Sequence, residues 1–86
     1  MTTQIRLFQL PTIEGVITLT VPAGTEFLGI QMTSYPVVLA LSNVDETEMR
    51  EEQILCVKGE QPMSLLGGTK YIGSVMLGLP FHYFHV

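Results

Sequence analysis

The residues with the greatest capacity for chemistry include two histidines near the C-terminus. His82 and His85 are three positions apart, and residues three apart on a strand point to opposite faces of the sheet. The two imidazoles therefore cannot bind one metal ion together, and no second cysteine or carboxylate stands at ligand spacing. We expect no metal site, and we interpret each histidine as a half-buried ring with a hydrogen-bonding tip.

A nucleophile with a partner base is also missing from the sequence. Cys56 lies between Leu55 and Val57, and a thiol buried among apolar residues has a raised pKa and is inert. The serines stand in no motif that pairs them with a base. We therefore expect no enzymatic activity and no cofactor, and a hydrolase that uses a histidine is the least favoured alternative.

A glycine-rich run offers the best candidate for ligand binding. In Gly67-Gly68-Thr69-Lys70, the backbone N–H groups could form a concave nest, followed by a hydroxyl and an ammonium group. The alternative is a flexible turn before a strand, because a phosphate-binding loop of the Walker type is longer and opens a helix. The residues predicted to bind a ligand are Tyr35, Gly67, Gly68, Thr69, Lys70, Tyr71 and His82.

Charge limits the possible partners. The chain has four basic and eight acidic residues, and without a basic stripe it lacks the electrostatic term that drives binding to long nucleic acids. A phosphorylated ligand needs several cations, so we expect its pocket where subunits meet and symmetry multiplies the charge.

Composition predicts a single small domain, residues 1–86, that associates with itself. Hydrophobic residues make up 47% of the chain and charged residues only 14%, although a small domain has proportionally more surface to cover. A homo-oligomer would bury part of this apolar surface. One cysteine, no signal-like N-terminus and no apolar run of membrane-spanning length predict an intracellular protein that is neither exported nor inserted in a membrane.

Apolar alternation with a period of two predicts the elements that must position these residues. Residues 26–42 indicate a hairpin around a Thr-Ser-Tyr-Pro turn, in which Gly29 suggests a bulge or a close backbone approach. Strands are expected at 5–10, 16–21, 27–32, 37–41, 53–58, 71–77 and 81–86, the first near an edge and the fourth in mid-sheet. The fold class is all-β, a compact antiparallel sandwich or small barrel of about seven short strands, with at most a short helical turn near 45–52.

Three segments resemble a family of small, functionally uncharacterised bacteriophage proteins. They are VITLTVPAGTEFLGIQM at 16–32, PVVLALSN at 36–43 and KYIGSVMLGLPFHYFHV at 70–86. The chain departs from that pattern in two places: the second segment has aliphatic residues where a tryptophan is frequent, and Glu60-Gln61-Pro62 replaces a Gly-His-Pro. The resemblance implies a phage product in the cytoplasm of a host bacterium and transfers no catalytic residue.

Two functions follow as expectations. The first is a non-enzymatic phage accessory protein, a homo-oligomer that counters a host defence by sequestering a small nucleotide signal or by capping a host protein. The alternative is a structural component of the virion, such as a decoration or assembly module, because small β-rich subunits with apolar edges also suit lattice contacts.

Overall fold

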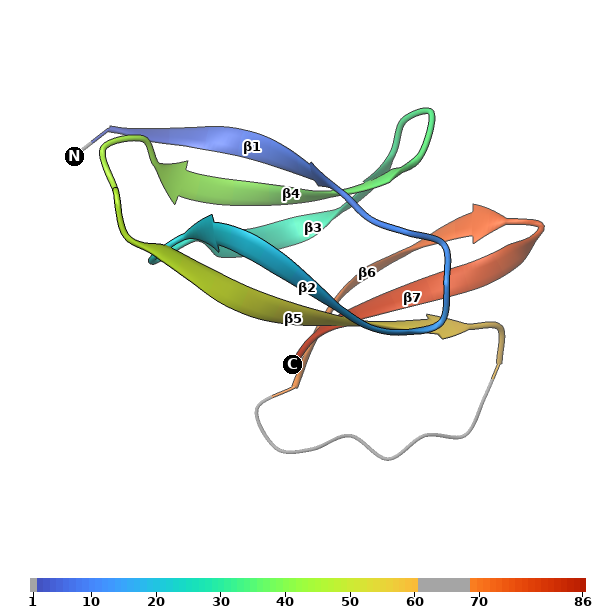
Figure 1. The fold of residues 1–86 in the computed structure, drawn as a ribbon. Coiled ribbons are helices and arrows are strands. Elements are labelled where there is room, and N and C mark those ends of the chain that lie inside the picture. Colours follow the sequence, from blue (N-terminus) through green and yellow to red (C-terminus); the bar gives the residue numbers. More distant parts are fainter. Residues whose placement is uncertain (1, 61–68) are drawn as a thin grey trace.

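The computed structural model describes residues 2–60 and 69–86, which form seven strands and no helix (Figure 1). The strands are β1 (Thr3–Gln9), β2 (Gly15–Pro22), β3 (Glu26–Met32), β4 (Pro36–Asn43), β5 (Met49–Lys58), β6 (Lys70–Leu77) and β7 (Leu79–His85). The glycine turn predicted to precede β6 falls partly outside the described residues, because these omit Gly67 and Gly68. The described residues contain no helix that could cross a membrane.

The strands form two antiparallel sheets. One has three strands in the order β1-β4-β3, and the other has four in the order β2-β5-β7-β6. The predicted all-β antiparallel fold is therefore confirmed, and its form is that of a small sandwich. The first strand lies at an edge and β4 lies in the middle of its sheet, as the proline positions and the apolar run of β4 predict.

The core lies between the two sheets and takes residues from both. Its buried members are Leu10, Val21, Phe27, Val38, Ala40, Ile54, Cys56, Val75, Phe81 and Tyr83. Tyr83 has no exposed surface, and its hydroxyl donates to the Pro11 carbonyl across 3.2 Å. Because Pro11 follows β1 and precedes β2, this bond fastens β7 to the connection between the two sheets.

One seam between the sheets is closed by a close backbone approach of β3 to β6. Each strand carries a bulge there, between Phe27 and Gly29 in β3 and between Tyr71 and Gly73 in β6. Gly73 has a φ of 150°, and a Cβ placed on it would lie 3.2 Å from the backbone nitrogen of Ile30. Only glycine permits this backbone contact without strain. The bulge suggested by Gly29 is confirmed.

The acidic segment differs from its prediction. Residues 45–52 form no helical turn, which the limit of at most one allows, but β5 begins at Met49, four residues before the strand expected at 53–58. Asn43 closes a tight turn instead, because its Oδ1 accepts from the Asp45 N–H at 3.0 Å. Glu51 and Glu52 then pair with β2, which supplies the backbone partners that the local sequence does not reveal.

We expect Gly73→Ala to lower the free energy of unfolding by about 1–3 kcal/mol, because the methyl group meets the Ile30 backbone in a conformation that L residues avoid. The shift of the urea midpoint at constant slope measures this loss.

Gly29→Ala is the matched control. Gly29 lies on the facing strand, and its added Cβ would come no nearer than 3.9 Å, to the Ile72 carbonyl oxygen. We expect a change of less than about 1 kcal/mol. Equal stability of the two variants would contradict a seam fixed by Gly73.

Candidate functional site

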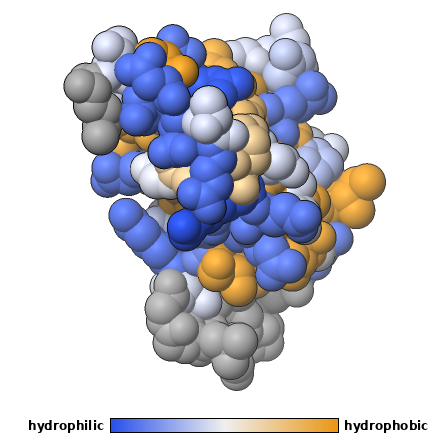
Figure 2. Space-filling model, turned by 60° about the vertical axis from the view of Figure 1, so that its left-hand side comes forward, coloured by the Kyte–Doolittle hydropathy of each residue, from blue (hydrophilic) through white to orange (hydrophobic). Residues whose placement is uncertain are grey.

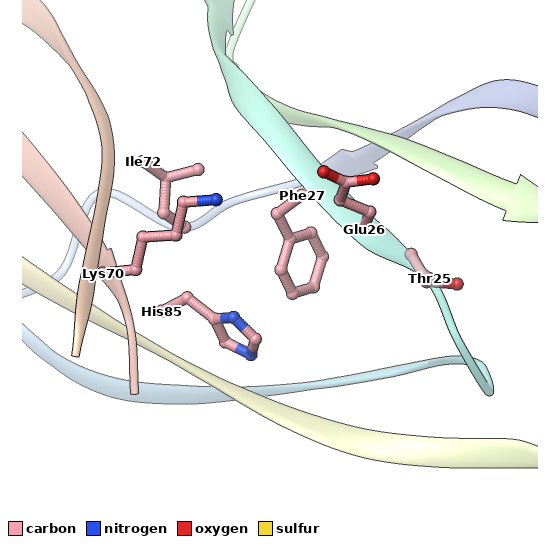
Figure 3. A pocket seen from close by; sticks show the side chains of 6 residues that line it. All are labelled: Thr25, Glu26, Phe27, Lys70, Ile72 and His85. Carbon is pink, nitrogen blue, oxygen red and sulfur yellow. The ribbon is translucent and has the colours of Figure 1, made fainter. Parts of the chain in front are cut away.

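A pocket of about 190 Å³ lies beside the seam where β3 faces β6. Its walls come from the start of β3, the start of β6 and the end of β7, and they are Thr25, Glu26, Phe27, Lys70, Ile72 and His85. Figure 3 shows these side chains gathered around one space, with the amine of Lys70 pointing from β6 toward β3. Segments far apart in the chain therefore meet here.

The inner wall of the pocket is apolar and aromatic. Phe27 is 6% exposed and belongs to the core. The His85 ring meets it edge to face, with the ring centroids 4.9 Å apart and the planes at 86°. Ile72 packs against the same core from the bulge of β6. The pocket therefore offers flat, apolar surfaces of the kind that hold a ring.

His85 is fixed in orientation by a second contact. Its Nε2 lies 2.9 Å from Oε2 of Glu52, and both side chains are about one-third exposed. This contact joins β7 to β5, and together with the perpendicular contact to Phe27 it holds the imidazole from two sides. The expectation that His85 is a half-buried ring with a hydrogen-bonding tip is confirmed.

Glu26 and Lys70 bring opposite charges to the exposed rim of the pocket. Within the described residues, neither forms an ion pair. A carboxylate accepts hydrogen bonds and an ammonium group donates them. The rim can therefore contact a ligand that carries both a donor and an acceptor.

A partly buried pair of hydroxyl groups supports the turn that leads into β3. Thr25 Oγ1 donates to the Pro22 carbonyl at 2.6 Å and lies 2.9 Å from Oγ of Ser42, which is 1% exposed. Because the Thr25 hydrogen is directed at Pro22, the Ser42 hydroxyl donates to Thr25. Gly24 precedes this pair with a φ of 79°, a positive angle that glycine adopts without steric cost in a tight turn.

The residues predicted from sequence do not form one site. Lys70 lines the pocket, and Thr69 immediately precedes it without lining it. Tyr35 lies in the β3–β4 turn, at the opposite end of the hairpin from Phe27. Gly67 and Gly68 lie outside the described residues.

Tyr71 and His82 lie on the outer face of the four-stranded sheet, away from the pocket. The Tyr71 hydroxyl donates to Ser74 at 3.0 Å, and Ser74 is paired with His82 across the strands. Phe84 lies beside Tyr71, with ring centroids 5.4 Å apart. His82 and His85 therefore face opposite sides, as the spacing of three residues predicts.

Sequence reasoning missed most of the pocket. Phe27 and Ile72 were expected only as strand residues, and Glu26 only as the start of a hairpin. The alternation of apolar residues does not say which strands of opposite sheets meet, and two bulges decide this here. Gly29 was the one signal in the sequence that pointed to the seam.

Cys56 and Tyr83 are buried neighbours in the core and lie outside the pocket. Burial raises the pKa of the Cys56 thiol, an effect that a hydrogen bond with Tyr83 partly opposes and Glu14 reinforces. Burial also raises the pKa of the Tyr83 hydroxyl. A neutral, inaccessible thiol is a poor nucleophile, in agreement with the inert role expected of Cys56.

The described residues define a small β-sandwich with a pocket at the seam between its sheets. They hold no cluster of three or more histidine, cysteine, aspartate or glutamate residues that could bind a metal ion. Comparison with family models, with curated proteins and with solved structures finds no match for this chain.

We expect Thr25→Val to lower the free energy of unfolding by about 1–3 kcal/mol, because it leaves the buried Ser42 hydroxyl without its partner. The double variant Thr25→Val with Ser42→Ala removes both hydroxyls and should lose less than the single variant does. Urea unfolding of these two variants and of Ser42→Ala alone gives the free energies of unfolding for a double-mutant cycle. Additive losses would show that the two hydroxyls do not interact.

Proposed function

We propose that the protein is a non-enzymatic binding protein that holds a small nucleotide, with the base of the nucleotide in the pocket at the seam. The observation that carries this proposal is the combination of lining groups: two flat or apolar walls from Phe27 and Ile72, the ring of His85, and a separate acceptor and donor at the rim. Binding pockets typically combine apolar walls with a few polar groups in this way.

The charges favour the base over the phosphate as the buried part of the ligand. A phosphate inside the pocket would lie near the carboxylate of Glu26 and near Glu52 behind His85. The base of a nucleotide is a heterocycle whose N–H groups can donate hydrogen bonds to the Glu26 carboxylate. The faces of such a base stack on aromatic rings. Lys70, exposed at the rim, is placed to pair with a phosphate that remains outside.

The volume supports the same arrangement. Pockets that enclose a drug-sized ligand measure about 300–1,000 Å³. At about 190 Å³, this pocket is too small for a whole nucleotide and suits one ring. The six lining residues of one chain form the walls for such a ring, whereas a phosphorylated ligand was expected in a pocket shared between subunits.

The resemblance to bacteriophage proteins supplies a setting for such binding. In a host bacterium, a homo-oligomer of this protein would sequester a nucleotide signal of a defence system and would need no catalytic group to do so. This agrees with an inert Cys56 and with a His85 whose Nε2 is engaged by Glu52. Capping of a host protein is the other form of the same function.

Calorimetric titration with cyclic AMP, a cyclic dinucleotide and ADP-ribose tests the proposal. We expect at least one of them to bind, and we expect Lys70→Ala and Glu26→Gln each to weaken that binding by about 10- to 100-fold, the loss of a hydrogen bond to a charged group. Lys58→Ala is the matched control, since Lys58 lies near the Phe81 ring and does not line the pocket.

The control variant should bind as the wild type does. If Lys70→Ala and Glu26→Gln bind the nucleotide as tightly as Lys58→Ala does, the ligand lies elsewhere on the molecule. If none of the nucleotides binds to the wild type, nucleotide sequestration is wrong and capping of a host protein is the form that survives.

A virion component is a second candidate, favoured by apolar side chains on the outer strands. Ile5 and Leu7 are 62% and 55% exposed on β1, and Met76 is 70% exposed on β6. Lattice contacts between subunits would cover such residues. Mass spectrometry of purified particles separates the candidates, because many copies per virion are expected of a decoration protein and none of a sequestering protein.

A further inference from the structure

We propose that β1 is the surface through which the protein dimerises. Its free edge, which pairs with no other strand in the described part of the chain, would pair antiparallel with β1 of a second copy. The three-stranded sheet would then continue as six strands across the two-fold axis. This deepens the homo-oligomer of the proposed function by naming its interface. It does not depend on the nucleotide pocket, which lies at the other edge of the same sheet.

The hydrogen-bonding pattern identifies which groups of β1 are free. The Leu10 N–H donates to Pro36 at 2.9 Å, and the Val44 N–H donates to Thr2 at the same distance. Hydrogen-bonded pairs alternate with non-bonded pairs along an antiparallel ladder. The even-numbered residues of β1 therefore bond to β4, and the odd-numbered residues present their N–H and C=O groups at the free edge. These are Thr3, Ile5, Leu7 and Gln9.

The free edge has few of the features that prevent edge strands from pairing with other chains. β1 contains no proline and no bulge, and Arg6 is its only charged residue. Two of the odd-numbered side chains, Ile5 and Leu7, are more than half exposed. In a self-pairing they would lie beside the same side chains of the second copy and bury apolar surface.

The distribution of charge permits a second copy at β1 and favours this edge over the edge of β2. The chain has a net charge of −4, so two copies repel unless their acidic residues stay apart. None of the acidic residues lies in β1 or β4, whereas β5, the neighbour of the free strand β2, carries Glu51 and Glu52. The side of the molecule that carries the β4–β5 connection in Figure 1 comes forward in Figure 2, where the visible surface is largely hydrophilic with separate hydrophobic patches.

Arg6 restricts the register of the pairing. If β1 overlapped fully with its copy, Arg6 would stand directly opposite Arg6 of the second copy, in a non-bonded pair with close side chains. A shift of two residues in either direction places Arg6 opposite Gln4 or Phe8 of the second copy instead. The second shift preserves the chemistry that Arg6 already shows, since its guanidinium lies 5.0 Å from the Phe8 ring centroid.

Two proline variants test the interface. Leu7→Pro removes an N–H that faces the free edge of β1 and leaves every bond to β4 intact. Thr18→Pro is the matching variant on β2. The Ala23 N–H donates to Glu48, so the odd-numbered residues of β2 bond to β5 and the even-numbered residues, Thr18 among them, face the free edge of β2. Light scattering should give twice the 9.5 kDa chain mass for the wild type and for Thr18→Pro, and a single chain mass for Leu7→Pro.

Leu7→Lys provides a second test that keeps the backbone N–H and does not depend on how proline is tolerated. A charged lysine side chain on an edge strand disfavours pairing with another strand. This variant should therefore also have the mass of one chain, with the circular dichroism of the wild type. A monomeric wild-type protein would overturn the proposal. It would equally be overturned if Leu7→Lys stayed dimeric, or if Thr18→Pro alone became monomeric.

Discussion

The structure depends on how closely the backbone of β3 approaches that of β6. At Gly73 the two strands lie so near that an added Cβ would come 3.1 Å from the Ile30 side chain, and both strands carry a bulge there. This contact converts two sheets with four edges into a sandwich with one closed seam. It also brings the residues around Phe27 beside those around Ile72, which is what creates a pocket.

Closing one seam leaves the other open, and the two flanks of the molecule therefore differ. The edges of β3 and β6 face each other, whereas β1 and β2 each keep a free edge within the described part of the chain. At this open flank the two sheets are linked by the segment that contains Pro11, and the buried Tyr83 hydroxyl donates a hydrogen bond to the Pro11 carbonyl. Our two proposals therefore use different flanks: ligand binding at the closed seam, and self-association at the open flank.

Much of the fold follows from the sequence because local rules govern it. Alternating residues such as Ile17 and Thr18 identify strands by period alone, and prolines such as Pro11 mark their ends. The start of β5 could not be found in this way, since Glu51 and Glu52 are extended only because β2 pairs with them. The pocket escaped prediction for the same reason, as its residues come together through contacts between sheets.

The separation of the two flanks has a thermodynamic consequence. In a dimer paired through β1, the two copies of β3 would lie at the outer edges of one six-stranded sheet, five strand spacings or about 24 Å apart. A ligand couples to association only if it binds the monomer and the dimer with different affinity. Each pocket is lined by one chain and lies at the edge of the sheet opposite to β1, so the two sites should fill independently. In the dimer that we propose, self-association covers the apolar edge of a strand whose one charged residue is Arg6.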